Sequence, residues 1–306
     1  MGKRKPTIAI CYDFDGTLSP GNMQEYDFFP QLDIKPRNFW KEAKKRAKEQ
    51  QGDSILSYMC LMIEKAVASG RVKITRKAFG DYGKQVKLFD GVVDWFKRVN
   101  EYGREKGASI EHYIISSGIR EMIEGTPIAR EFKKIYASAF WYDQHDVAKW
   151  PAQALNFTTK TQFLFRVNKG CLNEWDDVEV NKYVSERKRS IPFKRMIYIG
   201  DGTTDIPCMK LVKVQGGYSI AVYKPSTRGA KADAEKLLKE NRVNFVLPAD
   251  YTEGSPLDRK VKALIDMMVA EFIVEKRVYQ RRRKAAVRTK QQQENRPDDV
   301  SEVSQV

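Results

Sequence analysis

The stretch IAICYDFDGTLSP, residues 8–20, ends an apolar run with two carboxylates and a glycine turn. Residues 8–12 have the composition of a buried β-strand, and Asp13 and Asp15 follow them directly. Two carboxylates in such a place repel each other, and they are costly to bury unless a cation or hydrogen-bond donors offset their charge. The stretch therefore predicts either a cation-dependent site at a strand end or an ordinary turn rich in aspartate.

Charge is unevenly distributed along the 306-residue chain, whose 42% hydrophobic content is enough for one large domain or two of ordinary size. The formal net charge is +15, and positions 276–290 contribute eight lysines and arginines with no acidic residue. About half of the excess charge therefore belongs to one segment near the C-terminus. That segment is either a solvated tail or a surface for anionic polymers such as nucleic acid.

The cysteines indicate a reducing compartment, because Cys11, Cys60, Cys171 and Cys208 are widely separated and form no Cys-x-x-Cys pair. The apolar run after the basic N-terminus is too short for a signal peptide, and no stretch is long enough and free enough of charge to span a membrane. We expect a soluble cytoplasmic protein. Its oligomeric state is not specified by the sequence.

Short apolar runs alternate with helical patterns, and strands are expected at residues 8–12, 112–115, 196–199 and 218–222. This alternation predicts an α/β fold, with a doubly wound, Rossmann-like parallel sheet covered by helices on both faces. Ligands of such sheets gather at the carboxyl ends of the strands. We therefore expect DFDGT, SSGIR and GDGTTD, which follow three of these strands, to meet at one edge.

The chain between the first two strands is too long for a single crossover and has apolar residues at helical spacing. We expect residues 19–88 to form an inserted helical cap and residues 1–18 and 89–270 to form the core. A helix is expected from Ser255 to about Arg282. Residues 271–306 are expected to be the basic end of this helix followed by a disordered tail, TKQQQENRPDDVSEVSQV, residues 289–306. Residues 137–170 alternate in places, as in TKTQFLFRV, which indicates extra strands or a hairpin whose role is open.

Four aspartates are candidate metal ligands. Asp13 and Asp15 are two residues apart on an extended strand end and can face the same ligand. Asp201 and Asp205 flank a glycine turn and can converge on one cation if Asp205 begins a helix. Hard oxygen donors without histidine or thiolate suit Mg²⁺. Each motif alone also fits a capped loop.

A phosphate site is indicated by Ser116, Ser117 and Gly118, where a hydroxyl and free backbone N–H groups are expected at a helix start. A plain helix cap is the alternative. Charge balance would also require a lysine. Lys182, expected at the start of a helix, is one candidate, and Lys169 is its rival.

In the order Asp-x-Asp, Ser, Lys, Gly-Asp-x₃-Asp, these motifs resemble the haloacid dehalogenase superfamily of phosphohydrolases, and within it the phosphoserine-phosphatase-like branch. The resemblance covers residues 8–20, 112–120 and 180–225, together with the position of the cap. It implies a Mg²⁺-dependent phosphomonoesterase that hydrolyses a small phosphorylated metabolite through an aspartyl-phosphate.

The resemblance also implies residue roles. Asp13 would be the nucleophile and Asp15 the general acid and base. The catalytic set would be Asp13, Asp15, Ser116 and Lys182; the phosphate-binding set Phe14, Ser116, Ser117, Gly118 and Lys182; and the metal set Asp13, Asp15, Asp201 and Asp205.

Two departures from the family pattern leave the substrate open. Ser117-Gly118 stands where phosphoserine phosphatases have Gly-Gly, and Asn22, with Glu25 nearby, stands where an acidic residue would hold the substrate amine. A phosphotransferase or mutase of the same superfamily is an alternative. A nucleic-acid binder acting through the basic segment is another.

Overall fold

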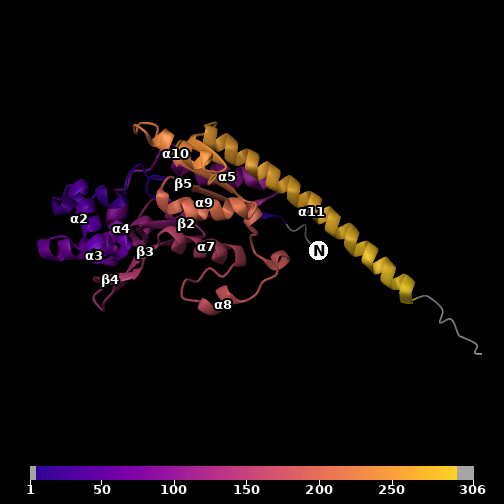
Figure 1. The fold of residues 1–306 in the computed structure, drawn as a ribbon, viewed down its shortest axis with the longest axis horizontal. Helices are drawn as coiled ribbons and strands as arrows, with labels where there is room; N and C mark the ends of the chain where they lie inside the picture. Colours follow the sequence, from indigo (N-terminus) through magenta and orange to yellow (C-terminus); the bar gives the residue numbers. More distant parts are fainter. Residues whose placement is uncertain (1–4, 295–306) are drawn as a thin grey trace, which may run out of the picture.

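The computed structural model describes residues 5–294, and the side chains of residues 5–285. Its strands are β1 (Thr7–Tyr12), β2 (Ser109–Ile119), β3 (Lys134–Tyr142), β4 (Ala148–Gln153), β5 (Met196–Gly200), β6 (Tyr218–Tyr223) and β7 (Phe245–Pro248). Its α-helices are α1 (Phe28–Leu32), α2 (Pro36–Glu49), α3 (Ser54–Ser69), α4 (Arg76–Gly83), α5 (Val92–Glu105), α6 (Arg120–Glu124), α7 (Phe157–Lys169), α8 (Asp177–Asn181), α9 (Ile206–Val214), α10 (Ala230–Lys239) and α11 (Pro256–Glu294) (Figure 1).

The strands form one sheet in the order β4-β3-β2-β1-β5-β6-β7. All neighbouring strands pair in parallel except β3 and β4, which are antiparallel. β1 lies in the middle, between β2 and β5. The expected doubly wound parallel sheet is confirmed, and the strand order places the ends of β1, β2 and β5 side by side.

Alternate residues of β1 face opposite sides of the sheet, as the two-residue period of a strand requires. Ile8 and Ile10 pack into a core shared with α5, α11 and the helices that follow β1, whereas Ala9 and Cys11 pack into a second core with α7, α9 and α10. All four of these side chains are fully buried. Burial on both faces explains why the strand is a continuous apolar run.

The inserted helices α1–α4 lie together beside the carboxyl ends of the strands (Figure 1). The backbones of α4 and α6 touch: a Cβ on Gly83 would lie 1.9 Å from the carbonyl oxygen of Met122, and one on Gly125 would lie 1.9 Å from that of Gly80. Only glycine permits such an approach. The helical insertion is therefore fixed to the sheet domain through α4.

Residues 137–170 divide into two parts with different roles. β3 and β4 form the expected hairpin, and the ring of Phe140 stacks on Phe79 of α4 at 5.0 Å between centroids. The second part was interpreted wrongly, because the TKTQFLFRV segment is the helix α7. Two features of the sequence mark the ends of this helix: a capping box formed by Asn156 and Thr159 at its start, and Gly170 after its last residue.

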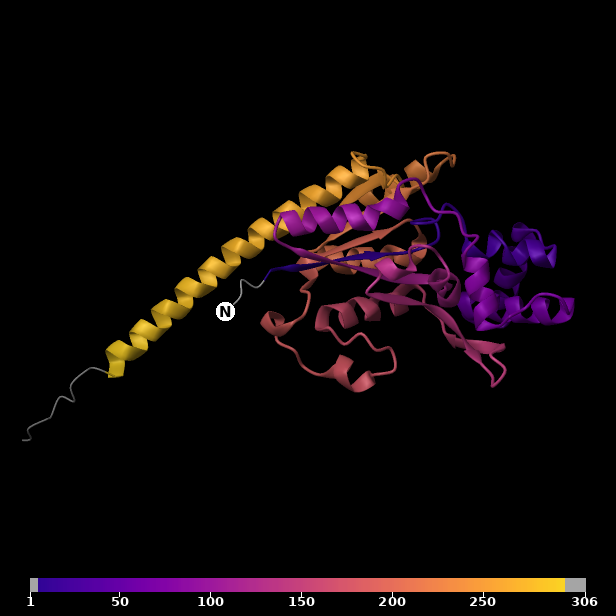
Figure 2. The same ribbon diagram turned by 180° about the vertical axis from the view of Figure 1, so that it is seen from behind.

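Helix α11 begins near the expected residue but is longer than expected, extending to Glu294. Residues 289–294, expected to be disordered, belong to it, and residues 295–306 of the expected tail lie outside the described residues. Figure 2 shows α11 passing along the sheet domain and continuing away from it. Of the helices described, none combines the length and apolarity that crossing a membrane requires.

A buried chain of hydrogen bonds lies behind the end of β1. The indole Nε1 of Trp95 donates to the hydroxyl of Tyr12 at 2.9 Å. That hydroxyl lies 3.0 Å from Nδ1 of His112, whose Nε2 lies 3.1 Å from Oδ1 of Asn100. A neutral imidazole that accepts at Nδ1 and donates at Nε2 satisfies the whole chain. Burial lowers the pKa of His112 to about 3.

Stability should consequently depend on pH through His112. Below pH ~6.5 the unfolded chain binds a proton on this histidine, but the folded chain does not until about pH 3, so the free energy of unfolding falls as the pH falls through this window. The difference in the free energy of unfolding between wild type and His112→Gln should therefore shrink by about 1.4 kcal/mol per pH unit below pH ~6. Urea denaturation at several pH values measures it, and parallel curves for the two proteins would contradict the assignment.

Candidate active site

Asp13 directly follows β1 and remains aligned with the sheet, because its backbone N–H donates to the carbonyl of Ile199 at 3.0 Å. Its carboxylate is only 6% exposed. The chain then reverses tightly, and the carbonyl of Phe14 accepts hydrogen bonds from the N–H groups of Leu18 at 2.8 Å and Ser19 at 3.0 Å. The DFDGT motif is thus a rigid turn at the carboxyl end of the central strand.

Gly16 permits this turn to approach the third motif. Its φ of 77° lies in the left-handed region that glycine adopts without strain. An added Cβ would also lie 2.0 Å from Oδ2 of Asp201. The hydroxyl of Thr17 donates to Oδ1 of Asp201 at 3.4 Å. The two motifs are therefore in direct contact, although nearly two hundred residues separate them in the sequence.

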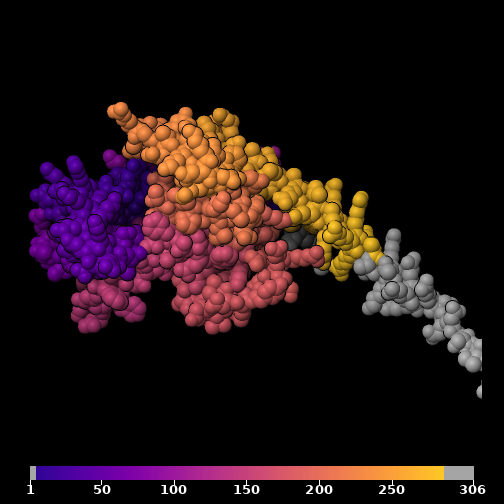
Figure 3. Space-filling model, in the orientation of Figure 1, coloured from indigo at the N-terminus to yellow at the C-terminus, as the bar shows by residue number. Residues whose placement is uncertain are grey.

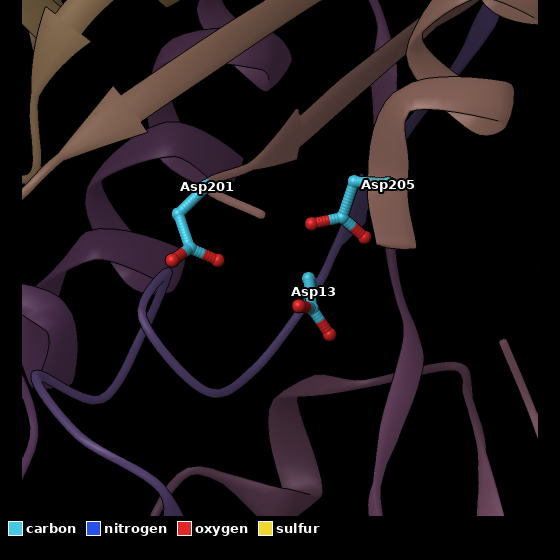
Figure 4. A group of neighbouring side chains, drawn as sticks. All are labelled: Asp13, Asp201 and Asp205. Atoms are coloured by element: carbon cyan, nitrogen blue, oxygen red, sulfur yellow. The ribbon is translucent and has the colours of Figure 1, made fainter. Parts of the chain in front are cut away.

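Three carboxylates converge at this edge, from Asp13, Asp201 and Asp205, as Figure 4 shows. One oxygen of each lies within 4.8 Å of the others. Asp201 immediately follows β5, and Asp205 ends the short 3₁₀ turn Thr203–Asp205 before α9. The expected convergence of Asp13, Asp201 and Asp205 is present in the structure.

Asp205 is completely buried and held from several sides. Its Oδ1 accepts from Tyr198 at 2.8 Å and from Lys160 at 2.7 Å, and its Oδ2 accepts from the backbone N–H of Gly202 at 3.2 Å. Both oxygens are already engaged. Asp205 is therefore better placed to orient Lys160 than to contact a ligand directly.

Lys160, in the first turn of α7, is the basic residue of the site. It is fully buried, and its Nζ lies 3.2 Å from Oδ1 of Asp13 and 2.7 Å from Oδ1 of Asp205. Burial alone would lower the pKa of Lys160, but the charges of Asp13 and Asp205 outweigh it and raise the pKa above its usual value. The side chain is therefore a permanent positive charge between two carboxylates.

The lysines expected from the sequence lie elsewhere, which corrects the prediction of Lys182. Lys182 follows the end of the short helix α8 and pairs on the surface with Glu179. The ammonium group of Lys169 donates hydrogen bonds to the backbone carbonyl oxygens of Val180 at 2.5 Å and Lys182 at 2.8 Å. Lys160 was missed because the segment that carries it was interpreted as a strand.

Asp15 lies next to the cluster of three carboxylates but does not belong to it, which corrects its prediction as a side-chain metal ligand. Its Oδ1 instead accepts the backbone N–H of Met23 at 2.9 Å. Burial, with a smaller contribution from the charge of Asp13, raises the pKa of Asp15 well above its usual value. This shift favours the protonated carboxyl group over the carboxylate.

The Ser116–Gly118 segment reaches the same edge of the sheet. Ser116 is buried, and its hydroxyl lowers the pKa of Asp13 by hydrogen bonding, as does the backbone of Phe14. A Cβ on Gly118 would lie 3.1 Å from Oδ2 of Asp15. The expected helix start at Ser117 is wrong, because β2 runs irregularly to Ile119 and α6 begins one residue later. A phosphate would therefore meet a strand end rather than a helix N-terminus.

The site carries more negative than positive charge, and a divalent cation would offset the excess. Burial, followed by the charge of Asp205, raises the pKa of Asp13 to about 6, whereas Lys160 opposes the shift. Burial and the charges of Asp13 and Asp205 also raise the pKa of Asp201. Oδ1 of Asp13 has the ammonium group of Lys160 at 3.2 Å but accepts no well-aligned hydrogen bond among the described residues. Hard oxygen donors with this unmet charge suit Mg²⁺.

The inserted helices contact the site domain at two places near these residues. Asp53 caps α3 by accepting the N–H of Ile55 at 2.8 Å, and its other oxygen accepts from the side chain of Asn156, the residue that caps the lysine-bearing helix α7. The hydroxyl of Tyr58 donates to the carbonyl of Ser117 at 2.7 Å. The insertion therefore touches both the lysine helix and the serine segment.

The doubly wound sheet, the helical insertion after its first strand and the buried acidic edge define a Rossmann-like hydrolase architecture. The family model described as haloacid dehalogenase-like hydrolase matches residues 10–210, about two thirds of the chain. The chain belongs to this family. An uncharacterized protein of Borreliella burgdorferi (strain B31) is 29% identical over 283 residues, which cover 84% of this chain and 96% of that protein.

Solved structures show the same fold at low sequence identity. A probable phosphoserine phosphatase from Vibrio cholerae has a TM-score of 0.54 at 11% identity, over 87% of this chain and 67% of its own. A haloacid dehalogenase family hydrolase from Salmonella enterica serovar Typhi has a TM-score of 0.51 at 16% identity, over 79% and 68%. A phosphoserine phosphatase captured as a phospho-aspartyl intermediate analogue has a TM-score of 0.50 at 14% identity, over 85% and 99%.

Loss of Lys160 should destabilise the fold in a way that a divalent ion can partly offset. Lys160→Met leaves Asp13 and Asp205 buried without their cation, and removal of one partner from a buried ion pair costs about 3–5 kcal/mol. We expect a loss of this size in the free energy of unfolding without divalent ions, and partial recovery with millimolar Mg²⁺. Urea denaturation with and without Mg²⁺ measures both effects.

Lys182→Met is the matched control, because the pair of Lys182 with Glu179 is exposed to solvent and contributes little to stability. Equal losses for the two variants would show that Lys160 is not the charge-balancing residue.

Proposed function

We propose that this protein is a Mg²⁺-dependent phosphomonoesterase that hydrolyses a small phosphorylated metabolite through a phosphorylated Asp13. One observation carries the proposal: a buried lysine lies 3.2 Å from Asp13, and an oxygen of Asp201 lies within 4.8 Å of an oxygen of the same carboxylate. A carboxylate so placed can accept a phosphoryl dianion only if positive charge surrounds it. Unlike charges at such distances are worth about 4 kcal/mol each at an intermediate dielectric.

In the first step, one carboxylate oxygen of Asp13 bonds to phosphorus as the bond from phosphorus to the leaving oxygen breaks. Lys160 stabilises the charge on the nucleophile and on the phosphoryl oxygens. The hydroxyl of Ser116 and the backbone N–H groups of Phe14 and Ser117 would donate to those oxygens. The N–H of Gly118, also expected to bind phosphate, already donates to Oγ of Ser116 at 3.1 Å. Lys160, and not Lys182, is the lysine that balances charge in this step.

Asp15 donates a proton in the first step and accepts one in the second. Its raised pKa favours the protonated carboxyl group, and the leaving oxygen takes that proton as the ester bond breaks. The resulting carboxylate then removes a proton from water, which attacks phosphorus and releases phosphate from Asp13. Asp15 ends protonated again, so the cycle balances.

The residues that would hold Mg²⁺ are Asp13 and Asp201, with Asp205 orienting Lys160 behind them. When bound, the ion would neutralise phosphoryl oxygens and bring them to Asp13. Asp15 would contribute through its backbone and not through its side chain, because its carboxylate is occupied by Met23.

The inserted helices support a small substrate. Asp13 and Ser116 are almost inaccessible with the helices in this position, so only a compact molecule fits beneath them without a large rearrangement. We propose that residues 19–88 act as a cap over a core of residues 1–18 and 89–270, with residues 271–306 as a separate basic segment. A cytoplasmic location agrees with the four free cysteines.

Asp13→Asn should abolish release of inorganic phosphate from p-nitrophenyl phosphate in the presence of Mg²⁺. The amide is too weak a nucleophile to form the phosphorylated enzyme, and we expect a loss of about 10³-fold or more. Circular dichroism and thermal unfolding should show a folded protein. Retained turnover would exclude Asp13 as the nucleophile.

The same assay distinguishes hydrolysis from phosphotransfer in the wild type. Release of p-nitrophenol in one burst, without steady release of phosphate, would indicate a transferase that excludes water. Steady release of both products in equal amounts is the expected result.

Asp15→Asn should slow hydrolysis of alkyl phosphates more than that of aryl phosphates. An alkoxide leaves poorly without a proton, whereas p-nitrophenolate leaves readily, and general acid catalysis contributes about 10²–10⁴-fold. The ratio of kcat/KM for the two substrate types measures the effect. Equal losses for both types would contradict the acid role.

A further inference from the structure

The outer part of α11 is a basic helix that the proposed hydrolysis does not use. Arg277 and residues 281–284 are exposed, and no ion pair among the described residues engages them. Nearer the sheet, by contrast, Glu271 and Glu275 of the same helix pair with Lys194. The guanidinium group of Arg187 lies over the ring of Tyr279, 5.2 Å from its centroid, and beyond this contact the helix extends past the sheet domain (Figure 3).

Positive charge surrounds the helix instead of forming a stripe. Successive residues of an α-helix are turned by about 100°, so Arg281, Arg282, Arg283 and Lys284 point in four directions around the axis. In the sequence, residues 276–290 contain no acidic residue. This segment is about 21 Å long at 1.5 Å per residue.

The distribution of basic residues around the helix favours some anionic partners over others. A membrane surface contacts one side of a helix and requires an apolar face opposite the charges. Here the basic residues occupy every side, and the exposed apolar residues Val278 and Tyr279 do not form a separate face among them. A partner with negative charge on several sides of the helix can contact more of these basic residues.

We infer that the outer part of α11 binds double-stranded DNA in its major groove, without sequence preference. That groove is about 12 Å wide, which admits an α-helix of about 10–12 Å diameter, and phosphates line both of its walls. The major groove of double-stranded RNA is too deep and narrow for this. Among the described side chains of residues 276–285, Tyr279 is the one aromatic, so no platform for stacking the bases of single strands is present.

This inference goes beyond the proposed hydrolysis and does not depend on it. Binding should be driven by release of counterions from the DNA. With about four to six phosphate contacts, the logarithm of the association constant should fall with the logarithm of salt concentration at a slope of about −4 to −5.

Fluorescence anisotropy of a labelled DNA duplex of about 20 base pairs, titrated with the full-length protein between about 50 and 200 mM salt, measures this slope. The test variant replaces Arg281, Arg282, Arg283 and Lys284 with glutamine, which keeps the helix and removes four charges. We expect its affinity to fall at least about tenfold and its slope to become shallower by about 2 to 4.

The matched control removes the same charge from the other end of the molecule, by replacing Lys41, Lys44, Lys45 and Lys48 of α2 with glutamine. It should bind DNA nearly as wild type does. Equal losses for the two variants would mean that net charge, and not α11, governs binding, and an unchanged α11 variant would also overturn the inference. Tighter binding to double-stranded RNA would contradict the major-groove argument, and tighter binding to phosphatidylserine-containing vesicles would indicate a membrane surface instead.

Discussion

The ion pair of Lys160 with Asp13 and Asp205 is the interaction on which the site depends. All three side chains are almost or completely buried, so each charge is tolerated only because the others are present. The pair also joins three separate parts of the chain: the end of β1, the turn after β5 and the first turn of α7. Burial of the two carboxylates and packing of α7 are therefore energetically coupled, because α7 supplies the positive charge that offsets theirs.

The topology of the sheet sets the rest of the arrangement. β1 lies between β2 and β5, so the turns that follow these strands meet at one edge, beneath the inserted helices. Gly16 allows the first turn to touch Asp201, and Asp53 links the insertion to the cap of the lysine helix. Helix α11 passes along the sheet domain and extends away from this edge, so its basic end is spatially separate from the site. Two kinds of phosphate recognition, one buried and one exposed, can therefore coexist in this chain.

The fold and the aspartates could be predicted from the sequence because their signals are local. A buried parallel strand is a continuous apolar run; Asp13 and Asp201 come directly after such runs, and Asp205 follows Asp201 by four residues. The lysine could not be predicted in the same way, because nothing beside Lys160 in the sequence marks it as a partner of Asp13. Its helix also has apolar residues that alternate over a short window, which favoured a strand, and the capping residues at its start were the stronger signal. Lys182 was chosen by its place in the order of motifs, but that order does not determine which helix points its side chain into the site.

The central claim is that a divalent ion lies between Asp13 and Asp201 and lets a phosphoryl group approach the first of them. Anomalous diffraction from crystals grown with Mn²⁺ in place of Mg²⁺ tests it most directly. We expect a single strong peak about 2 Å from a carboxylate oxygen of each of these two residues, with the ammonium group of Lys160 still beside Asp13. A peak located elsewhere, or carboxylates of Asp13 and Asp201 that turn away from each other, would contradict it.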